Sequence, residues 1–261
     1  MSQLDEQTQI QESEYSFPYH YIPALRSRKF SHTRYWSWGF RYLGGIQLVL
    51  DQLAKTPFSS LIDIGCGDGR FLREVSGHFH GKKLLGIDAS ARAVRLAHAF
   101  NPEIEYRCIN ILDEPVPGKF DVATLIEVIE HIPPERLPEF LRAVAGCLSD
   151  TGCLIITVPH QNKPLIKKHY QHFTSAHLKT LLEPLFSEFT FIPFDVRASR
   201  APLMWVIERI LGAKGKFFLL TNPRILYFFY ALYRRRYLYT DSEKHCERIA
   251  IACVKKPPGK L

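Results

Sequence analysis

The chain has 261 residues, of which 46% are hydrophobic, and it carries a formal net charge of +8. That length suits one large domain with additions and a full hydrophobic core. No stretch approaches the ~20 consecutive apolar residues of a membrane-spanning helix, which argues against an integral membrane protein. The charge is uneven, because residues 201–239 hold seven Lys or Arg and one Glu, a net +6. The remainder is nearly neutral, so nucleic acid is a less favoured partner for the chain as a whole.

The N-terminal part divides into two regions. Residues 1–14 are polar and rich in Gln and Glu, which predicts a disordered tail. Residues 15–58 begin with an aromatic, proline-restricted arm, and apolar positions at helical spacing from Tyr35 to Leu53 then predict an amphipathic helix. The arm either packs on that helix or closes over a substrate with a side chain of Tyr19, His20 or Tyr21.

From residue 59 to 200 apolar strand-like runs alternate with helical patterns, which predicts a parallel sheet with helices on both faces. The expected strands are 60–64, 83–87, 104–108, 120–126, 153–158 and 187–192, and the expected helices lie near 69–79, 90–100, 135–148 and 175–183. Residues 240–261 supply one more strand at 248–254 and a tail.

Residues 201–239 form an insertion before that last strand, too long for an ordinary loop. Helical patterns are expected over 203–211 and over 217–239, the second interrupted at Asn222-Pro223. In the second pattern five apolar or aromatic residues share one side and precede three arginines; the five are Leu226, Tyr227, Phe229, Tyr230 and Tyr233. Aromatic rings beside cations suit an anionic membrane surface. A substrate lid and a dimer face are the alternatives, and the oligomeric state is left open.

The six cysteines are scattered and form no Cys-x-x-Cys pair, and the chain shows no secretory leader. These features predict reduced thiols in a cytoplasmic protein. The aromatic and basic insertion adds the expectation of peripheral contact with the inner membrane face.

Three glycines at alternate positions, Gly65, Gly67 and Gly69, follow the first expected strand and precede its helix. This order brings backbone N–H groups to a helix N-terminus, and glycine lets a ligand approach them closely. The spacing differs from the Gly-x-Gly-x-x-Gly dinucleotide fingerprint, so an NAD-dependent oxidoreductase is disfavoured. Asp63 precedes the loop. Asp88 ends the second strand, where a carboxylate can accept both ribose hydroxyls; a helix N-cap is its alternative role.

The segment Asp63-Ile-Gly-Cys-Gly-Asp-Gly69, with Gly86-Ile-Asp88, resembles the first two motifs of the class I S-adenosylmethionine-dependent methyltransferases. The resemblance runs from about Ser59 to about Asp195. It implies a Rossmann-like, doubly wound α/β fold whose sheet is mostly parallel with an antiparallel last strand. It also implies S-adenosyl-L-methionine as cofactor and methyl transfer as the reaction.

The resemblance further implies which residues bind the cofactor. The glycine loop takes the methionine part, Asp88 takes the ribose, and Asn110 with Ile111 faces the adenine, although asparagine after a strand is also a common turn residue. The complete expected set is Asp63, Gly65, Cys66, Gly67, Gly69, Asp88, Ala89, Asn110, Ile111 and Glu127.

The fourth strand leads into Ile126-Glu-Val-Ile-Glu-His131. A helical turn would place the carboxylates of Glu127 and Glu130 on one face, beside His131. This motif resembles the metal-binding motif of two branches, the Hen1-type RNA 2′-O-methyltransferases and the quinone-biosynthesis O-methyltransferases. No metal is the favoured expectation; a metal, if present, would be bound by Glu127, Glu130, His131 and His172. His131, His172 and Glu127 are the expected catalytic residues, with a histidine as general base or pocket residue.

The expected function is methylation, at oxygen, of a small-molecule acceptor or of one linked to a lipid or glycan. A metal-dependent Hen1-type RNA 2′-O-methyltransferase is the alternative, with the +6 segment 201–239 binding phosphates. A further alternative is a non-catalytic binding protein that keeps the cofactor fold.

Overall fold

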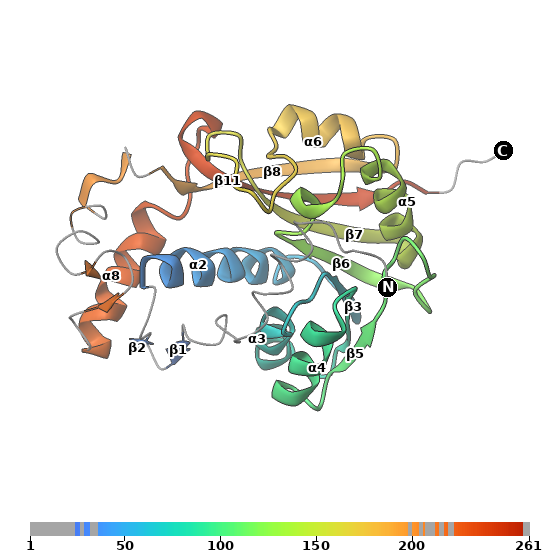
Figure 1. The fold of residues 1–261 in the computed structure, drawn as a ribbon, viewed down its shortest axis with the longest axis horizontal. Helices are drawn as coiled ribbons and strands as arrows, with labels where there is room; N and C mark the ends of the chain where they lie inside the picture. The colour runs from blue at the N-terminus through green and yellow to red at the C-terminus, as the bar shows by residue number, and fades with distance from the viewer. Residues whose placement is uncertain are drawn as a thin grey trace.

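The computed structural model describes residues 24–26, 29–31, 36–197, 200–203, 206, 212–213, 217–218 and 222–257. Within these ranges the central element is a seven-stranded sheet (Figure 1). Its strands, in spatial order, are β5 (Glu105–Cys108), β4 (Lys83–Asp88), β3 (Ser60–Ile64), β6 (Phe120–Ile126), β7 (Leu148–Pro159), β11 (Cys246–Lys255) and β8 (Phe186–Val196).

The first five strands in that spatial order pair in parallel, and β11 runs antiparallel to both of its neighbours. The expected Rossmann-like sheet with an antiparallel last strand is therefore confirmed. The strands β7, β8 and β11 extend beyond the expected ranges; β11 pairs with β8 along nearly the whole length of β8, and with β7 over Cys153–Pro159. The expected arm over 15–23 and most of the expected helix over 203–211 lie outside the described residues.

Helices cover both faces of the sheet, and each face has its own apolar core. The helices are α2 (Trp36–Leu53), α3 (Arg70–His78), α4 (Ala91–Phe100), α5 (Leu137–Cys147), α6 (Ser175–Leu182) and α8 (Pro223–Arg236). Because side chains alternate across a strand, Leu61 packs with α2, α3, α4 and α8, whereas Ile62 packs with α5 and α6. None of the helices in the described ranges combines the length and apolarity needed to cross a membrane.

Small elements complete the described chain. Two short hairpins are formed by β1 (Ala24–Arg26) with β2 (Lys29–Ser31), and by β9 (Gly212–Ala213) with β10 (Phe217–Phe218). Two 3₁₀ turns, η2 (Ile129–His131) and η4 (Glu243–His245), follow β6 and precede β11. All six cysteine thiols are free, as expected.

The helix α8 differs from the expectation for the insertion. Asn222 and Pro223 do not interrupt a helix but begin one, since the Asn222 side chain accepts from the Arg224 and Ile225 N–H groups.

The apolar side of α8 is not a free surface either. Leu226, Tyr230 and Tyr233 are buried against α2 and its neighbours, with the Tyr230 ring centroid 6.1 Å from that of Phe40. Membrane contact through 201–239 stays a prediction, but this side of the helix is unavailable for it.

A group of buried charges joins α2, α8 and the last two strands of the sheet. The carboxylate of Asp195 accepts from Arg248 Nε at 3.2 Å, from Arg41 Nη1 at 3.0 Å and from the Tyr233 hydroxyl at 3.1 Å. Arg248 also stacks its guanidinium 4.5 Å from the Phe194 ring centroid. A β-carbon on Gly45 of α2 would lie 2.9 Å from Arg248 Nη1, so a larger residue there would force the Arg248 side chain to shift. The Asp195 group therefore fixes α2 and α8 to the sheet.

Replacing Arg248 tests this group. Arg248→Met leaves Asp195 buried with fewer donors, and losing one partner of a buried ion pair typically costs about 3–5 kcal/mol. Arg234→Met is the matched control, because Arg234 pairs with Asp51 at 3.5 Å on the surface and such pairs contribute at most about 1 kcal/mol. Urea unfolding measures both, and equal losses in the two variants would contradict a central role for the Asp195 group.

Candidate active site

The loop after β3 has the backbone geometry that its glycines suggest. Gly65, Gly67 and Gly69 all have positive φ, at 76°, 56° and 78°. A β-carbon on Gly69 would lie 2.5 Å from the Tyr106 hydroxyl oxygen, so the position excludes any larger residue. The Gly65 and Cys66 N–H groups donate to the Ile87 carbonyl, and the Gly69 N–H donates to the Cys66 carbonyl. These N–H groups form hydrogen bonds within the protein and so stabilise the loop. The loop therefore serves a ligand mainly by letting it come close to the backbone, and not by donating hydrogen bonds from these three N–H groups.

Asp88 connects this loop to the end of β4. Its Oδ2 accepts from the Gly67 N–H at 2.9 Å, and its Oδ1 accepts from the Ser90 N–H at 2.8 Å. The N-cap of α4 is Ser90, whose hydroxyl oxygen accepts from the Ala93 N–H. The alternative role of Asp88 as a helix N-cap is therefore wrong. Its carboxylate lies beside the glycine loop at the carboxyl end of the sheet, where ligands of open α/β folds bind.

Asp63 is buried on β3 just before the loop. The Thr124 hydroxyl donates to its Oδ1 at 2.6 Å. Burial, followed in importance by the lowering effect of the Thr124 hydrogen bond and the raising effect of the nearby Asp88 charge, brings the pKa of Asp63 up to about 7. The carboxyl group is thus poised between its two protonation states near neutral pH.

The remaining expected cofactor residues divide between the rim and the interior. Ala89 is exposed beside Asp88, and Cys66 is buried in the loop, where burial raises the pKa of its thiol.

Asn110 has the turn role that is the alternative to adenine binding, because it donates to Asp113 Oδ2 at 2.5 Å and accepts from the Leu112 N–H. Ile111 is buried in the core that also contains α5. Contact of Asn110 and Ile111 with adenine remains a prediction.

Glu127 takes an unusual backbone conformation at the end of β6. Its φ is +55°, in the left-handed region that non-glycine residues rarely adopt, and its N–H donates to the Thr157 carbonyl. Its Oε1 is buried, has no hydrogen-bond partner in the part of the chain that the structure describes, and lies 4.0 Å from Arg248 Nη1. The helical turn begins only at Ile129, so the expectation that Glu127 and Glu130 share one helical face is wrong. Glu127 precedes the turn and faces Arg248.

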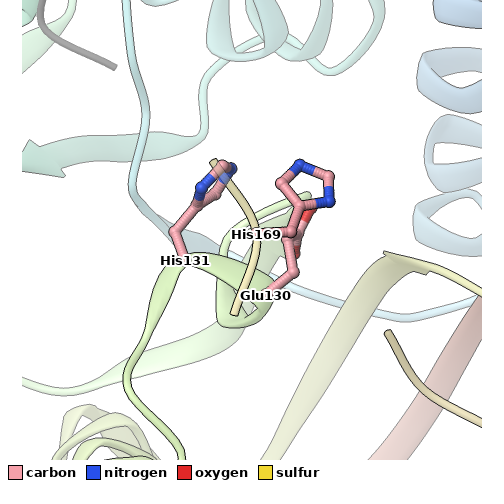
Figure 2. A group of neighbouring side chains, drawn as sticks. All are labelled: Glu130, His131 and His169. Atoms are coloured by element: carbon pink, nitrogen blue, oxygen red, sulfur yellow. The ribbon is translucent and has the colours of Figure 1, made fainter. Parts of the chain in front are cut away.

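Glu130, His131 and His169 form the polar group that the structure brings together (Figure 2). One ligand atom from each lies within 4.8 Å of the others. Glu130 is fully buried, and neither of its carboxylate oxygens has a hydrogen-bond partner among the described residues. Burial, and then the Glu127 charge, raises the pKa of Glu130 well above its usual range. An unsatisfied buried carboxyl group needs either a proton or a ligand.

Hydrogen bonds to carbonyl oxygens fix the tautomers of the histidines. His172 Nδ1 lies 3.0 Å from the Lys163 carbonyl oxygen, which can only accept, so Nδ1 carries the proton in the neutral ring. His172 Nε2 then accepts from His169 Nδ1 at 2.8 Å, which leaves the His169 Nε2 lone pair unprotonated. His131 Nδ1 lies 2.9 Å from the Lys168 carbonyl oxygen, so neutral His131 likewise keeps an unprotonated Nε2. The lone pairs of His131 Nε2 and His169 Nε2 thus lie in one cluster with the carboxyl group of Glu130.

His169 takes the place that the sequence analysis assigned to His172. Both ring nitrogens of His172 are occupied, by Lys163 and by His169, so His172 orients His169 and does not join the group itself. Burial lowers the pKa of both rings, that of His169 to about 3. In His169-x-x-His172 either histidine fits the motif, and only the fold of the connecting loop decides between them.

The group fits a divalent cation by its chemistry. Two neutral imidazole nitrogens with fixed tautomers and one carboxylate are a common ligand set, and the hydrogen bonds on the far nitrogens are typical partners of ligating histidines. The residues that would bind such an ion are Glu130, His131 and His169. Glu127 is not among them, in contrast to the set expected from the motif.

The fold and the loop after β3 define a class of protein, the class I S-adenosylmethionine-dependent methyltransferases. Residues 35–191, more than half of the chain, match the family model described as a methyltransferase domain. The chain belongs to this family and is an enzyme that uses S-adenosylmethionine as its cofactor. The alternative of a non-catalytic binding protein is thereby set aside.

Curated relatives resemble part of the chain. A ubiquinone biosynthesis O-methyltransferase of Chromobacterium violaceum is 28% identical over 120 residues, covering 43% of this chain and 50% of the relative. The enzyme of the same name from Neisseria meningitidis serogroup C is 32% identical over 134 residues, covering 49% and 53%. This chain spans about half the length of these relatives.

Solved structures share the fold. A SAM-dependent methyltransferase from Archaeoglobus fulgidus has a TM-score of 0.55 at 17% identity, covering 82% of this chain and 94% of its own. The N-methyltransferase NodS from Bradyrhizobium japonicum, in complex with S-adenosyl-L-homocysteine, has a TM-score of 0.54 at 16% identity, covering 84% and 88%.

Cofactor affinity tests the glycine loop. Gly67→Val forces a β-branched residue to φ 56°, and Asp88→Ala removes the carboxylate that accepts from the Gly67 N–H. Each is expected to weaken S-adenosylmethionine binding at least about tenfold, or ~1.4 kcal/mol, in calorimetry. Gly81→Val is the matched control, since Gly81 also has positive φ but open space around it. A folded Gly67→Val protein with native affinity would refute this assignment of the cofactor site.

The raised pKa of Asp63 predicts a pH dependence of stability. Between pH ~4 and ~7 the folded chain keeps a proton on Asp63 that the unfolded chain has lost, so this contribution to stability disappears as the pH rises. Relative to Asp63→Asn, the native chain should lose up to about 4 kcal/mol across this window. Asp121 is a control whose pH dependence has the opposite sign. The hydrogen bond that the Ser59 N–H donates to it lowers its pKa, so its contribution to stability is lost as the pH falls. Chemical unfolding at a series of pH values measures both, and a pH-independent difference would contradict the buried, protonated Asp63.

Proposed function

We propose that the enzyme transfers a methyl group to a phenolic oxygen of a lipid-linked acceptor of the quinone-precursor type. The curated relatives support this substrate class by their names, although each matches over only part of its length. The observation that carries the proposal is the Glu130–His131–His169 group, in which fixed tautomers leave unprotonated imidazole nitrogens beside a buried carboxyl group.

S-adenosylmethionine supplies an electrophilic methyl group on its sulfonium when it is bound. The protein's part is to align the acceptor oxygen and to take its proton. We assign proton acceptance to His131 Nε2, because its Nδ1 hydrogen bond to the Lys168 carbonyl oxygen orients the ring and fixes the tautomer. Since His131 is only half-buried at the end of η2, a substrate can reach it.

The neighbours of His131 suit this role. Burial keeps His169 neutral at pH 7 because it lowers the pKa to about 3, and burial, followed by the Glu127 charge, raises the pKa of Glu130 well above its usual range. Both shifts reduce the charge that the group carries before reaction, and His131 Nε2 can then take up one proton. His172 contributes indirectly by holding His169 in place.

Label transfer tests the proposal. Cofactor labelled on its methyl group is incubated with catechols that carry isoprenoid tails, with an aliphatic alcohol and an amine of matched length as controls. Label in the catechol ether alone is expected. His131→Gln should lower the rate about 10²-fold or more while cofactor affinity stays native. His78→Gln, at an exposed site on α3, should change nothing. Methylation of the amine in place of the catechol would overturn the choice of acceptor atom.

The same group also supports a second candidate, a metal-dependent RNA 2′-O-methyltransferase, because Glu130, His131 and His169 fit a divalent cation. The acceptor distinguishes the two, because the quinone-biosynthesis branch shares this metal-binding motif: label transferred to RNA and not to the tailed catechol would favour the RNA candidate. Chelation with EDTA tests the cation separately, and cofactor binding and most activity are expected to survive it. Loss of turnover that Mg²⁺ or Mn²⁺ restores, with calorimetric ion binding that Glu130→Gln and His169→Gln abolish, would establish a metal-dependent reaction.

A further inference from the structure

The loop between β7 and α6 borders the reaction site and is fixed to it on both sides. Before its tip, the Lys163 carbonyl oxygen binds His172 Nδ1. After its tip, the Lys168 carbonyl oxygen binds His131 Nδ1, and the Tyr170 N–H donates to the Glu130 carbonyl at 2.9 Å. The same loop supplies His169 to the polar group. The position of its tip is therefore set by the residues of the reaction site.

The tip itself, residues 164–167, faces solvent with two large apolar side chains. Leu165 is 58% exposed and Ile166 is 43% exposed, although they are adjacent in a loop that is otherwise anchored. Exposed apolar residues scattered singly are ordinary on a protein surface. Leu165 and Ile166 are adjacent and belong to an anchored loop, so together they leave apolar surface exposed to water. A partner could cover that surface.

Lysines flank these two side chains in the sequence. Lys163, Lys167 and Lys168 flank them, and the sequence from Thr151 to Leu182 contains no Asp or Glu. Both flanking positions, Pro164 and Lys167, are exposed as well, so the whole tip is accessible. An exposed apolar tip beside cations matches a lipid surface, where the side chains enter the acyl region and lysines meet anionic headgroups.

We propose that the tip at 164–167 docks the enzyme on an anionic membrane surface and thereby sets the reaction site at the level where a lipid-linked acceptor is held. Docking itself needs only the exposed residues. The benefit to acceptor delivery rests on the proposed function.

The outward side of α8 is the competing membrane surface. It presents Ile225, 41% exposed, and Phe228, 62% exposed, ahead of the arginines at 234–236. The tip differs from α8 because the residues on either side of the tip contact His131 and His172. A membrane bound at the tip would therefore lie next to the reaction site. The two surfaces have similar apolar content, and this makes each a fair control for the other.

Flotation with phosphatidylcholine vesicles, with or without phosphatidylglycerol, tests the docking. The native chain should float with the anionic vesicles at low salt and less so at high salt. Leu165→Ser with Ile166→Ser should reduce the bound fraction at least tenfold, whereas Ile225→Ser with Phe228→Ser should leave it within twofold of the native value. Native cofactor affinity in both double variants establishes that each is folded.

Three outcomes would overturn the inference: no binding of the native chain to anionic vesicles, equal binding by the native chain and the 165/166 variant, or loss confined to the 225/228 variant. The last would transfer membrane contact to α8.

An activity measurement separates this inference from the proposed function. The 165/166 variant should lose rate on a tailed catechol in anionic vesicles and keep the native rate on a short, water-soluble catechol. Loss on both acceptors would identify the tip as part of the acceptor pocket and not as a membrane dock. If neither acceptor is methylated by the native chain while vesicle binding persists, the proposed acceptor fails and the docking stands.

Discussion

The buried carboxylate of Asp195 is the interaction on which the arrangement outside the sheet depends. Four elements meet at it, because Arg41 comes from α2, Tyr233 from α8 and Arg248 from β11, while Asp195 itself lies on β8. Charges taken out of water must be satisfied completely, which allows very few relative positions of these elements. The group also reaches the reaction site through the 4.0 Å approach of Arg248 to Glu127. Through Arg248 the group therefore connects α2 and α8 with the end of β6.

The site itself is built by two different parts of the fold. The ends of β3 and β4 shape the cofactor side by backbone geometry, through the left-handed glycines and the Asp88 bridge to Gly67. The end of β6 and the loop after β7 supply the side chains that do chemistry, through η2 and His169. Glu127 lies between these parts in a conformation that costs energy, of the kind that surrounding packing must maintain. Strain of this kind commonly accompanies a functional position.

Local patterns predicted the fold well because the strand and helix periods and the glycine spacing are short-range signals. They failed where a distant partner or the conformation of a single turn or loop decides. Periodicity identified the apolar side of α8, but not that α2 covers it. The spacing of Glu127 and Glu130 suggested one helical face, but a left-handed residue breaks the period. His169 and His172 were indistinguishable by motif, because the choice between them depends on which carbonyl oxygen each ring meets. The first failure concerns a contact between residues far apart in the chain, and the other two concern the backbone conformation of a turn and a loop, which the motifs do not encode.

The position of β11 has a consequence for how the chain is made. It is the last strand of the sheet to leave the ribosome, yet it lies inside the sheet, between β7 and β8. Until Cys246–Lys255 has been synthesised, β8 has no strand to pair with and one edge of β7 stays open, while the remaining strands can already assemble. The nascent protein thus passes through a stage in which β8 is unpaired and one edge of β7 is open, and unpaired strand edges are templates for aggregation. Translation that stops short of β11 leaves this vulnerable form as its end product.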